Sequence, residues 1–180
     1  MKNLISQEHE LHPVQDVSFE KDSGHLVAQL DKRAFGLEAE GVLYRGKHFQ
    51  PKDELHITIL SSGAAEIVLE HLVRHPQDED RIRRLINSAG WSYKKIGRFY
   101  HIQAEPGVES LIQMVELPGL EQFFHELRSI VGADLPLPPT HVTLYTRGDP
   151  HGIGLPTRPV FEQRVQAEVT PDDWKPQESG

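Results

Sequence analysis

The chain of 180 residues contains no cysteine and no long hydrophobic run. The absence of cysteine excludes disulfides, thiolate zinc sites, iron–sulfur clusters and a cysteine nucleophile. No segment approaches the roughly 18 apolar residues that a membrane-spanning helix requires. Residues 1–11 hold few large apolar side chains, unlike the hydrophobic region of a secretory signal peptide. We therefore expect a soluble, cytoplasmic protein without a membrane partner.

The chain has fewer basic than acidic residues: 19 lysines and arginines and 27 aspartates and glutamates. Its net charge is −8 when the histidines are neutral. Long nucleic acids are bound mainly by neutralising their phosphates, so we expect no binding of long duplex nucleic acid. A small phosphate ligand in a locally basic cleft is compatible with this charge. Histidine is abundant, with 11 residues, and its ordinary pKa of about 6.5 suits proton transfer near neutral pH.

Hydrophobic patterning predicts strands that interleave with helices. The predicted strands cover residues 14–20, 26–30, 41–45, 54–60, 96–104, 110–117, 140–146 and 160–169. One helix is predicted directly after Ser61, a second over residues 78–89 and a third over residues 119–131. Because tight turns join several strands, we expect an α+β fold of two small antiparallel sheets with helices on their outer faces. The length predicts one domain over residues 1–171 and a polar, flexible tail over residues 172–180.

A loop rich in glycine and proline, residues 147–159, separates the last two predicted strands. Loops of about a dozen residues are often functional. We therefore expect this segment to have a role beyond connecting two elements.

Two predicted strands carry the same pattern, His-apolar-Thr-apolar. The copies begin at His56 and His141, which are 85 residues apart, and include Thr58 and Thr143. Side chains alternate along a strand, so the histidine and threonine of each copy share one face while the aliphatic residues pack behind them. Two such strands facing each other would surround one phosphate with two proton-transfer groups and two hydroxyl donors.

This pair of motifs resembles the two-histidine (2H) phosphoesterase superfamily, which includes bacterial RNA 2′-5′ ligase-like proteins and cyclic nucleotide phosphodiesterases. The resemblance implies a bilobal fold with pseudo-twofold symmetry, in which each lobe contributes one motif to a central cleft. It also implies chemistry without metal or cofactor, with His56, Thr58, His141 and Thr143 as the catalytic residues. The motifs cover few residues and indicate no particular subfamily.

We expect a monomeric enzyme that hydrolyses a cyclic or 2′-5′ nucleotide phosphodiester, above all a 2′,3′-cyclic phosphate on a nucleoside or an RNA end. RNA 2′-5′ ligation and hydrolysis of a cyclic oligonucleotide are enzymatic alternatives. A non-catalytic protein that binds a nucleotide or an RNA end is a further alternative, although a binder has little need of both imidazoles. The last alternative is a structural protein whose histidines have no chemical role.

Four other residues are candidates for substrate contacts. Strand alternation places Tyr145 and Arg147 on the face of the second motif, where the ring could stack on a base and the guanidinium could pair with a phosphate. Tyr44 and Arg45 precede the first motif by a short loop and could line the rim of the cleft. A basic cluster with the same potential role consists of Lys94, Lys95 and Arg98.

Three histidines outside the motifs have simpler interpretations. His71 and His75 stand four residues apart on a predicted helix, a spacing that can bind zinc. The His-Glu-x-x-His pattern is absent and no clear third ligand is in view, so we expect a solvated helix face and no metal. His101 lies on a predicted strand and is expected to be a core or surface residue.

Overall fold

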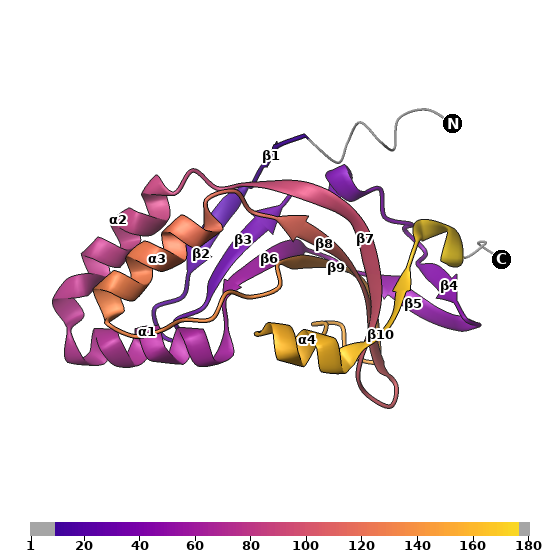
Figure 1. Cartoon of the computed structure of the whole chain (residues 1–180). Helices are drawn as coiled ribbons and strands as arrows, with labels where there is room; N and C mark the ends of the chain where they lie inside the picture. Colours follow the sequence, from indigo (N-terminus) through magenta and orange to yellow (C-terminus); the bar gives the residue numbers. More distant parts are fainter. Residues whose placement is uncertain (1–9, 177–180) are drawn as a thin grey trace.

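Two antiparallel sheets and four α-helices make up residues 10–176, the part of the chain that the computed structural model describes (Figure 1). The α+β class predicted from the sequence is confirmed. The helices are α1 (Ser62–Arg74), α2 (Glu79–Ser88), α3 (Leu120–Val131) and α4 (Arg158–Arg164). None of the helices among these residues is long and apolar enough to cross a membrane.

The larger sheet is strongly curled and the smaller one has three strands (Figure 1). The larger sheet has the order β1 (His12–Pro13), β7 (Ser92–Glu105), β8 (Val108–Glu116), β9 (His141–Arg147), β5 (Lys47–Pro51), β4 (Val42–Tyr44) and β11 (Lys175–Pro176), with β10 (Val165–Val169) paired to β7. The smaller sheet has the order β2 (Asp16–Phe19), β3 (Leu26–Leu30) and β6 (Leu55–Leu60). Strands β6 and β9 belong to different sheets but lie against each other.

Helices α1, α2 and α3 gather at the end of the molecule that holds the smaller sheet (Figure 1). Apolar residues at helical spacing give α3 a continuous buried face that includes Phe123, Phe124 and Leu127. Gly132 ends this helix in the left-handed conformation. The buried side chains of the three helices form one core with those of the smaller sheet and of one face of the larger sheet.

The last predicted strand, residues 160–169, is wrong over its first half, because this part of the chain forms α4. The Thr157 hydroxyl accepts a hydrogen bond from the backbone N–H of Val160, and Pro159 lies in the first turn, where its missing N–H costs nothing. These helix-start signals outweigh the strand propensity of the β-branched residues, and only Val165–Val169 forms a strand. Strand β5 was not predicted from the sequence.

Residues 172–176, expected to begin a flexible tail, are packed against the larger sheet. Trp174 meets the rings of Phe99 and Tyr145 edge-on, and β11 pairs with β4. Residues 177–180 lie outside the described part of the chain, as do residues 1–9. Residues 174–176, which the composition argument assigned to the tail, thus contact the larger sheet.

Strand β9 contains a bulge at Leu144. Thr143 pairs with Ile112 and Tyr145 pairs with the preceding residue of β8, Leu111, so Leu144 has no partner of its own. The extra residue reverses the alternation of side chains along the rest of the strand. Tyr145 and Leu111 accordingly lie in the main core, whereas Ile112 packs in a second cluster on the opposite face.

The loop between β9 and α4, residues 148–157, folds back over the face of the sheet that holds this second cluster. Ile153 and Leu155 of the loop are buried there against Tyr100 and Ile112. At its start, Gly148 has a φ of 88° and packs so tightly that a Cβ would collide with the carbonyl oxygen of Gly107. Two buried aliphatic side chains and one close backbone approach therefore fix the path of the loop.

We predict that Gly148→Ala destabilises the protein more than Gly46→Ala. Both glycines have a positive φ, but no heavy atom lies within 4 Å of a Cβ built at Gly46. Gly46→Ala should therefore cost about 1 kcal/mol of unfolding free energy for its backbone conformation alone, and Gly148→Ala about 2 kcal/mol more for the collision. Urea unfolding followed by circular dichroism measures both values, and equal losses would contradict this packing.

Candidate functional site

The structure brings the two motifs together at one pocket of about 250 Å³, called here the motif pocket. His56 and Thr58 come from β6, and His141 and Thr143 come from β9. The alternation predicted from the sequence holds over both motifs, because the intervening aliphatic residues are buried and these four side chains are partly exposed. The remaining lining residues are His25, Ser61, Ser62, His151, Gly152, Ile153, Gly154 and Leu155.

The ring of His141 is held in one orientation by the backbone. Its Nδ1 lies 2.8 Å from the carbonyl oxygen of Pro139. A carbonyl oxygen only accepts hydrogen bonds, so Nδ1 carries the proton and, in the neutral ring, Nε2 keeps its lone pair. Among the residues that the structure describes, no corresponding bond holds the ring of His56. The tautomer that leaves Nε2 free to accept a proton is therefore set at His141.

Both motif histidines favour the neutral form. Burial lowers the pKa of His56, and the positive charge of Lys52 lowers it further, against a smaller opposite effect of Glu54. Burial also lowers the pKa of His141, partly opposed by the bond to Pro139, and a charge on His56 would lower it more. A bound anion would raise both pKa values, since a nearby opposite charge stabilises imidazolium. Because the two charges repel each other, the pair is suited to carry a single proton.

A lysine fastens the loop that covers the motif pocket. Lys52 donates from Nζ to the carbonyl oxygens of Pro150, at 2.8 Å, and His151, at 3.2 Å. Its backbone N–H also donates to the carbonyl oxygen of Leu144 at 2.9 Å. The same ammonium therefore holds the loop and acts electrostatically on His56.

The first turn of α1 forms one end of the motif pocket. Ser61 precedes the helix without a side-chain capping bond, and Ser62 has an unusual positive φ of 47°. Gly152, on the covering loop, lies so close to Thr143 that a Cβ there would be 3.3 Å from the threonine methyl group. Glycine thus lets the loop rest directly on the second motif.

Several of these lining residues were not identified from the sequence. His25 and the two serines belong to no motif, and only their place in the fold brings them to the pocket. His151, Gly152 and Gly154 lie in the glycine- and proline-rich loop whose length had suggested a role. Loop length and composition were therefore the one signal that pointed to part of this set.

The structure does not bring Tyr145 and Arg147 to the motif pocket. The bulge at Leu144 turns both side chains to the other face of β9, so the predicted alternation does not continue past Thr143. The hydroxyl of Tyr145 accepts a hydrogen bond from the backbone N–H of Glu38 at 2.9 Å. The ring is thereby fixed in the core, away from the motifs.

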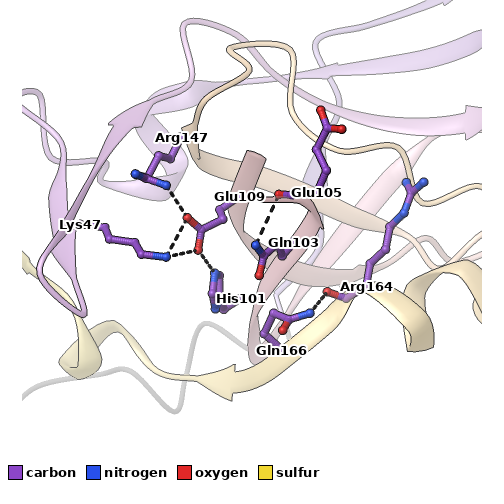
Figure 2. A network of polar contacts seen from close by, with 8 residues as sticks. All are labelled: Lys47, His101, Gln103, Glu105, Glu109, Arg147, Arg164 and Gln166. Atoms are coloured by element: carbon purple, nitrogen blue, oxygen red, sulfur yellow. Dashed lines mark hydrogen bonds and ion pairs between the residues drawn. The ribbon is translucent and has the colours of Figure 1, made fainter. Parts of the chain in front are cut away.

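Arg147 instead belongs to a cluster around a buried carboxylate (Figure 2). Glu109 accepts bonds from Arg147 at 2.7 Å, from Lys47 at 3.1 Å and from Nε2 of His101 at 2.9 Å. Burial raises the pKa of Glu109, but these three donors outweigh it and the pKa lies below its usual value. Burial lowers the pKa of His101, so the ring serves as a neutral donor in a structural cluster.

Tyr44 and Arg45 also lie outside the motif pocket. Tyr44 is buried, with its ring edge-on to Phe49 and His101, and the Arg45 guanidinium lies 5.3 Å above the Tyr44 ring. The chain turns back at the β4–β5 hairpin, which carries these residues away from β6. Of the basic cluster in β7, Arg98 pairs with Glu168.

No metal site is evident among residues 10–176, where no three histidine, cysteine, aspartate or glutamate residues come together as ligands. The rings of His71 and His75 lie 4.7 Å apart, but Nε2 of His71 is 2.7 Å from a carboxylate oxygen of Asp78. His71 is therefore bonded to Asp78 at the end of α1.

Comparisons of the chain with protein-family models, with curated proteins and with solved structures found no match. The argument for a function therefore depends on the geometry and chemistry of the motif pocket alone.

We predict that Lys52→Met raises the pKa of His56. The substitution removes a positive charge that disfavours imidazolium and releases the loop from its two carbonyl bonds. Titration of the histidine ring protons by NMR measures the change, with Lys32→Met, at an exposed position, as the control. An unchanged His56 titration would show that the ammonium does not act on this ring.

We also predict that the free energy of unfolding falls as the pH drops below about 6.5. His56, His101 and His141 have lowered pKa values in the folded chain, so the unfolded chain binds protons that the folded chain does not. Urea unfolding between about pH 7.5 and pH 5.5, above the range of most carboxylates, measures this slope. A chain carrying both His56→Gln and His141→Gln should show a shallower slope, and His125→Gln, at an exposed position, should not.

Proposed function

We propose that this protein is a metal-independent phosphodiesterase that hydrolyses a nucleotide phosphodiester, above all a 2′,3′-cyclic phosphate on a nucleoside or an RNA end. The observation that carries the proposal is the meeting of two His-x-Thr motifs, from strands 85 residues apart in the sequence, at one pocket. A structural role would explain one such pair on a strand face. It gives no reason for both pairs to line the same cavity.

In the proposed mechanism, the hydroxyls of Thr58 and Thr143 donate hydrogen bonds to the non-bridging oxygens of the phosphate. His141, with Nδ1 held by Pro139, takes a proton from water at Nε2 as the water oxygen attacks phosphorus. His56, protonated in the field of the bound anion, gives its proton to the leaving ribose oxygen. The bond from phosphorus to that oxygen breaks, and a phosphomonoester and a free hydroxyl result.

The two motif strands also support the proposed membership of the 2H phosphoesterase superfamily. On this view the smaller sheet with β6 and the larger sheet with β9 correspond to two lobes related by pseudo-twofold symmetry. The substrate is a small nucleotide or an RNA end rather than a long duplex, in keeping with the net charge of −8.

The decisive experiment incubates the protein with cyclic nucleotides and 2′-5′ dinucleotides in the presence of EDTA and identifies products by mass spectrometry. We expect ring opening of 2′,3′-cyclic phosphates to monoesters, with a bell-shaped pH–rate profile that belongs to the histidine pair. Joining of RNA ends or cleavage of a cyclic oligonucleotide instead would select those activities. Tight binding without turnover would indicate a binding protein, and activity that requires a divalent ion would contradict the mechanism.

Substitutions separate the roles within the motifs. His56→Ala or His141→Ala should reduce kcat by about 10²- to 10⁴-fold, because each removes a proton-transfer group. Thr58→Val and Thr143→Val should cost about 10- to 100-fold, partly through KM, since a neutral hydroxyl donor is weaker. His125→Ala, on the surface of α3, serves as the control and should keep full activity. Near-normal turnover by either the His56→Ala or the His141→Ala variant would overturn the two-histidine mechanism.

A further inference from the structure

A second cavity, of about 490 Å³, lies on the opposite face of β9 from the motif pocket. Leu144 and Tyr145, at the bulge, line this cavity, whereas Thr143 lines the motif pocket. Strand β9 therefore contributes residues to both cavities. The proposed function uses no residue of this second cavity, called here the aromatic cavity.

Four aromatic rings line the aromatic cavity, namely those of Phe35, Phe99, Tyr145 and Trp174. Trp174 lies edge-on to Phe99, with ring centroids 5.8 Å apart, and edge-on to Tyr145 at 6.1 Å. All of these rings except that of Tyr145 are partly exposed. Partly exposed rings around a concave space offer both the apolar area and the edge and face geometry that a planar ligand requires.

One cation is directed toward the same space. The ammonium of Lys95 lies 4.6 Å from the ring centroid of Phe35 and donates to the carbonyl oxygen of Ala34. Burial lowers the pKa of Lys95, and Glu10 opposes this from a distance. Among residues 10–176, Lys95 forms no ion pair. A half-buried ammonium without a bound carboxylate is stabilised when an anion comes within reach.

Two other charged residues, Arg33 and Glu38, line the aromatic cavity beside Lys95. Arg33 lines the cavity, but its guanidinium is largely exposed and is paired with Asp31 at 3.0 Å. Glu38 also lines the cavity and its side chain is exposed to solvent, while its backbone N–H is bonded to Tyr145. Within the described part of the chain, Lys95 is therefore the cation beside the aromatic rings that is not paired with a carboxylate, whereas the charge of Glu38 acts at Tyr145, where burial and this charge raise the pKa of the hydroxyl.

We propose that the aromatic cavity is a binding site for a planar aromatic anion, whose ring packs among Phe35, Phe99 and Trp174 and whose anionic group pairs with Lys95. An aromatic carboxylate and a base carrying a phosphate share this chemistry. The proposal does not depend on the motif pocket, and it stands whether or not the motifs catalyse phosphodiester hydrolysis.

The test on the unmodified chain uses naphthoate as the aromatic anion, naphthylmethylammonium as the matched aromatic cation, and acetate as an anion without a ring. NMR follows the indole N–H of Trp174, with that of Trp91, bonded to the Ile86 carbonyl oxygen at 2.9 Å, as an internal control. We expect saturable shifts at Trp174 with naphthoate, at least tenfold weaker effects with the other two compounds, and no shift at Trp91. Equal binding of the cation, or no saturable shift at Trp174, would overturn the proposal.

Variants then test the cation directly. Lys95→Met should weaken naphthoate binding at least tenfold, as expected for loss of a charge-assisted contact, and Lys95→Arg should retain most of it. Lys94→Met is the matched control, because Lys94 is the neighbouring residue on β7 and does not line the cavity. Equal binding by the two methionine variants would contradict the role of Lys95. A mononucleotide added in place of naphthoate distinguishes a phosphate-bearing base from an aromatic carboxylate.

Discussion

The contact between β6 and β9 is the constraint on which the motif pocket depends. The two strands belong to different sheets, so no ladder of backbone hydrogen bonds joins them. Side-chain packing sets their relation, together with the short connection from β5 to β6, which is bonded to β9. Behind the motifs, Ile57, Ile59 and Val142 are almost fully buried in one shared core. Each fully buried aliphatic side chain contributes about 1.5 to 3 kcal/mol relative to exposure. The apolar residues of the motifs are therefore what holds the polar ones in place.

The buried polar groups of the Glu109 cluster and those of the motif pocket are stabilised in different ways. Around Glu109, side chains of opposite charge are paired, with Lys47, Arg147 and a neutral His101 donating to one buried carboxylate. In the motif pocket the described side chains include no such counter-charge, and burial keeps His56 and His141 neutral instead. A pocket of neutral imidazoles and hydroxyls beside a lysine retains an unmet capacity for negative charge. At Glu109 the buried carboxylate is satisfied by three donors of the chain itself, which fits a structural role.

The fold class, most element boundaries and the face shared by each histidine and threonine could be predicted from the sequence, because all three follow from local periodicity. The bulge at Leu144 could not, since its cause is the pairing of β9 with β8 rather than a residue type. That single inserted residue explains why Tyr145 and Arg147 lie on the far face. His25 and Ser61 were beyond sequence reasoning for the same reason, because only tertiary packing brings them to the pocket. Helix α4 was missed although Thr157 and Pro159 carried the local signal.

The separation of the two motifs along the chain also shapes how the molecule must assemble. His56 and His141 are 85 residues apart, and β5, which borders β9, likewise precedes it by about half of the domain. Contacts between distant segments form late, because closing a long loop costs entropy before any packing is gained. The smaller sheet and the β7–β8 hairpin can each form from neighbouring segments. The pocket has no such local precursor, because its two halves come from β6 and β9 and meet only where these two strands are docked.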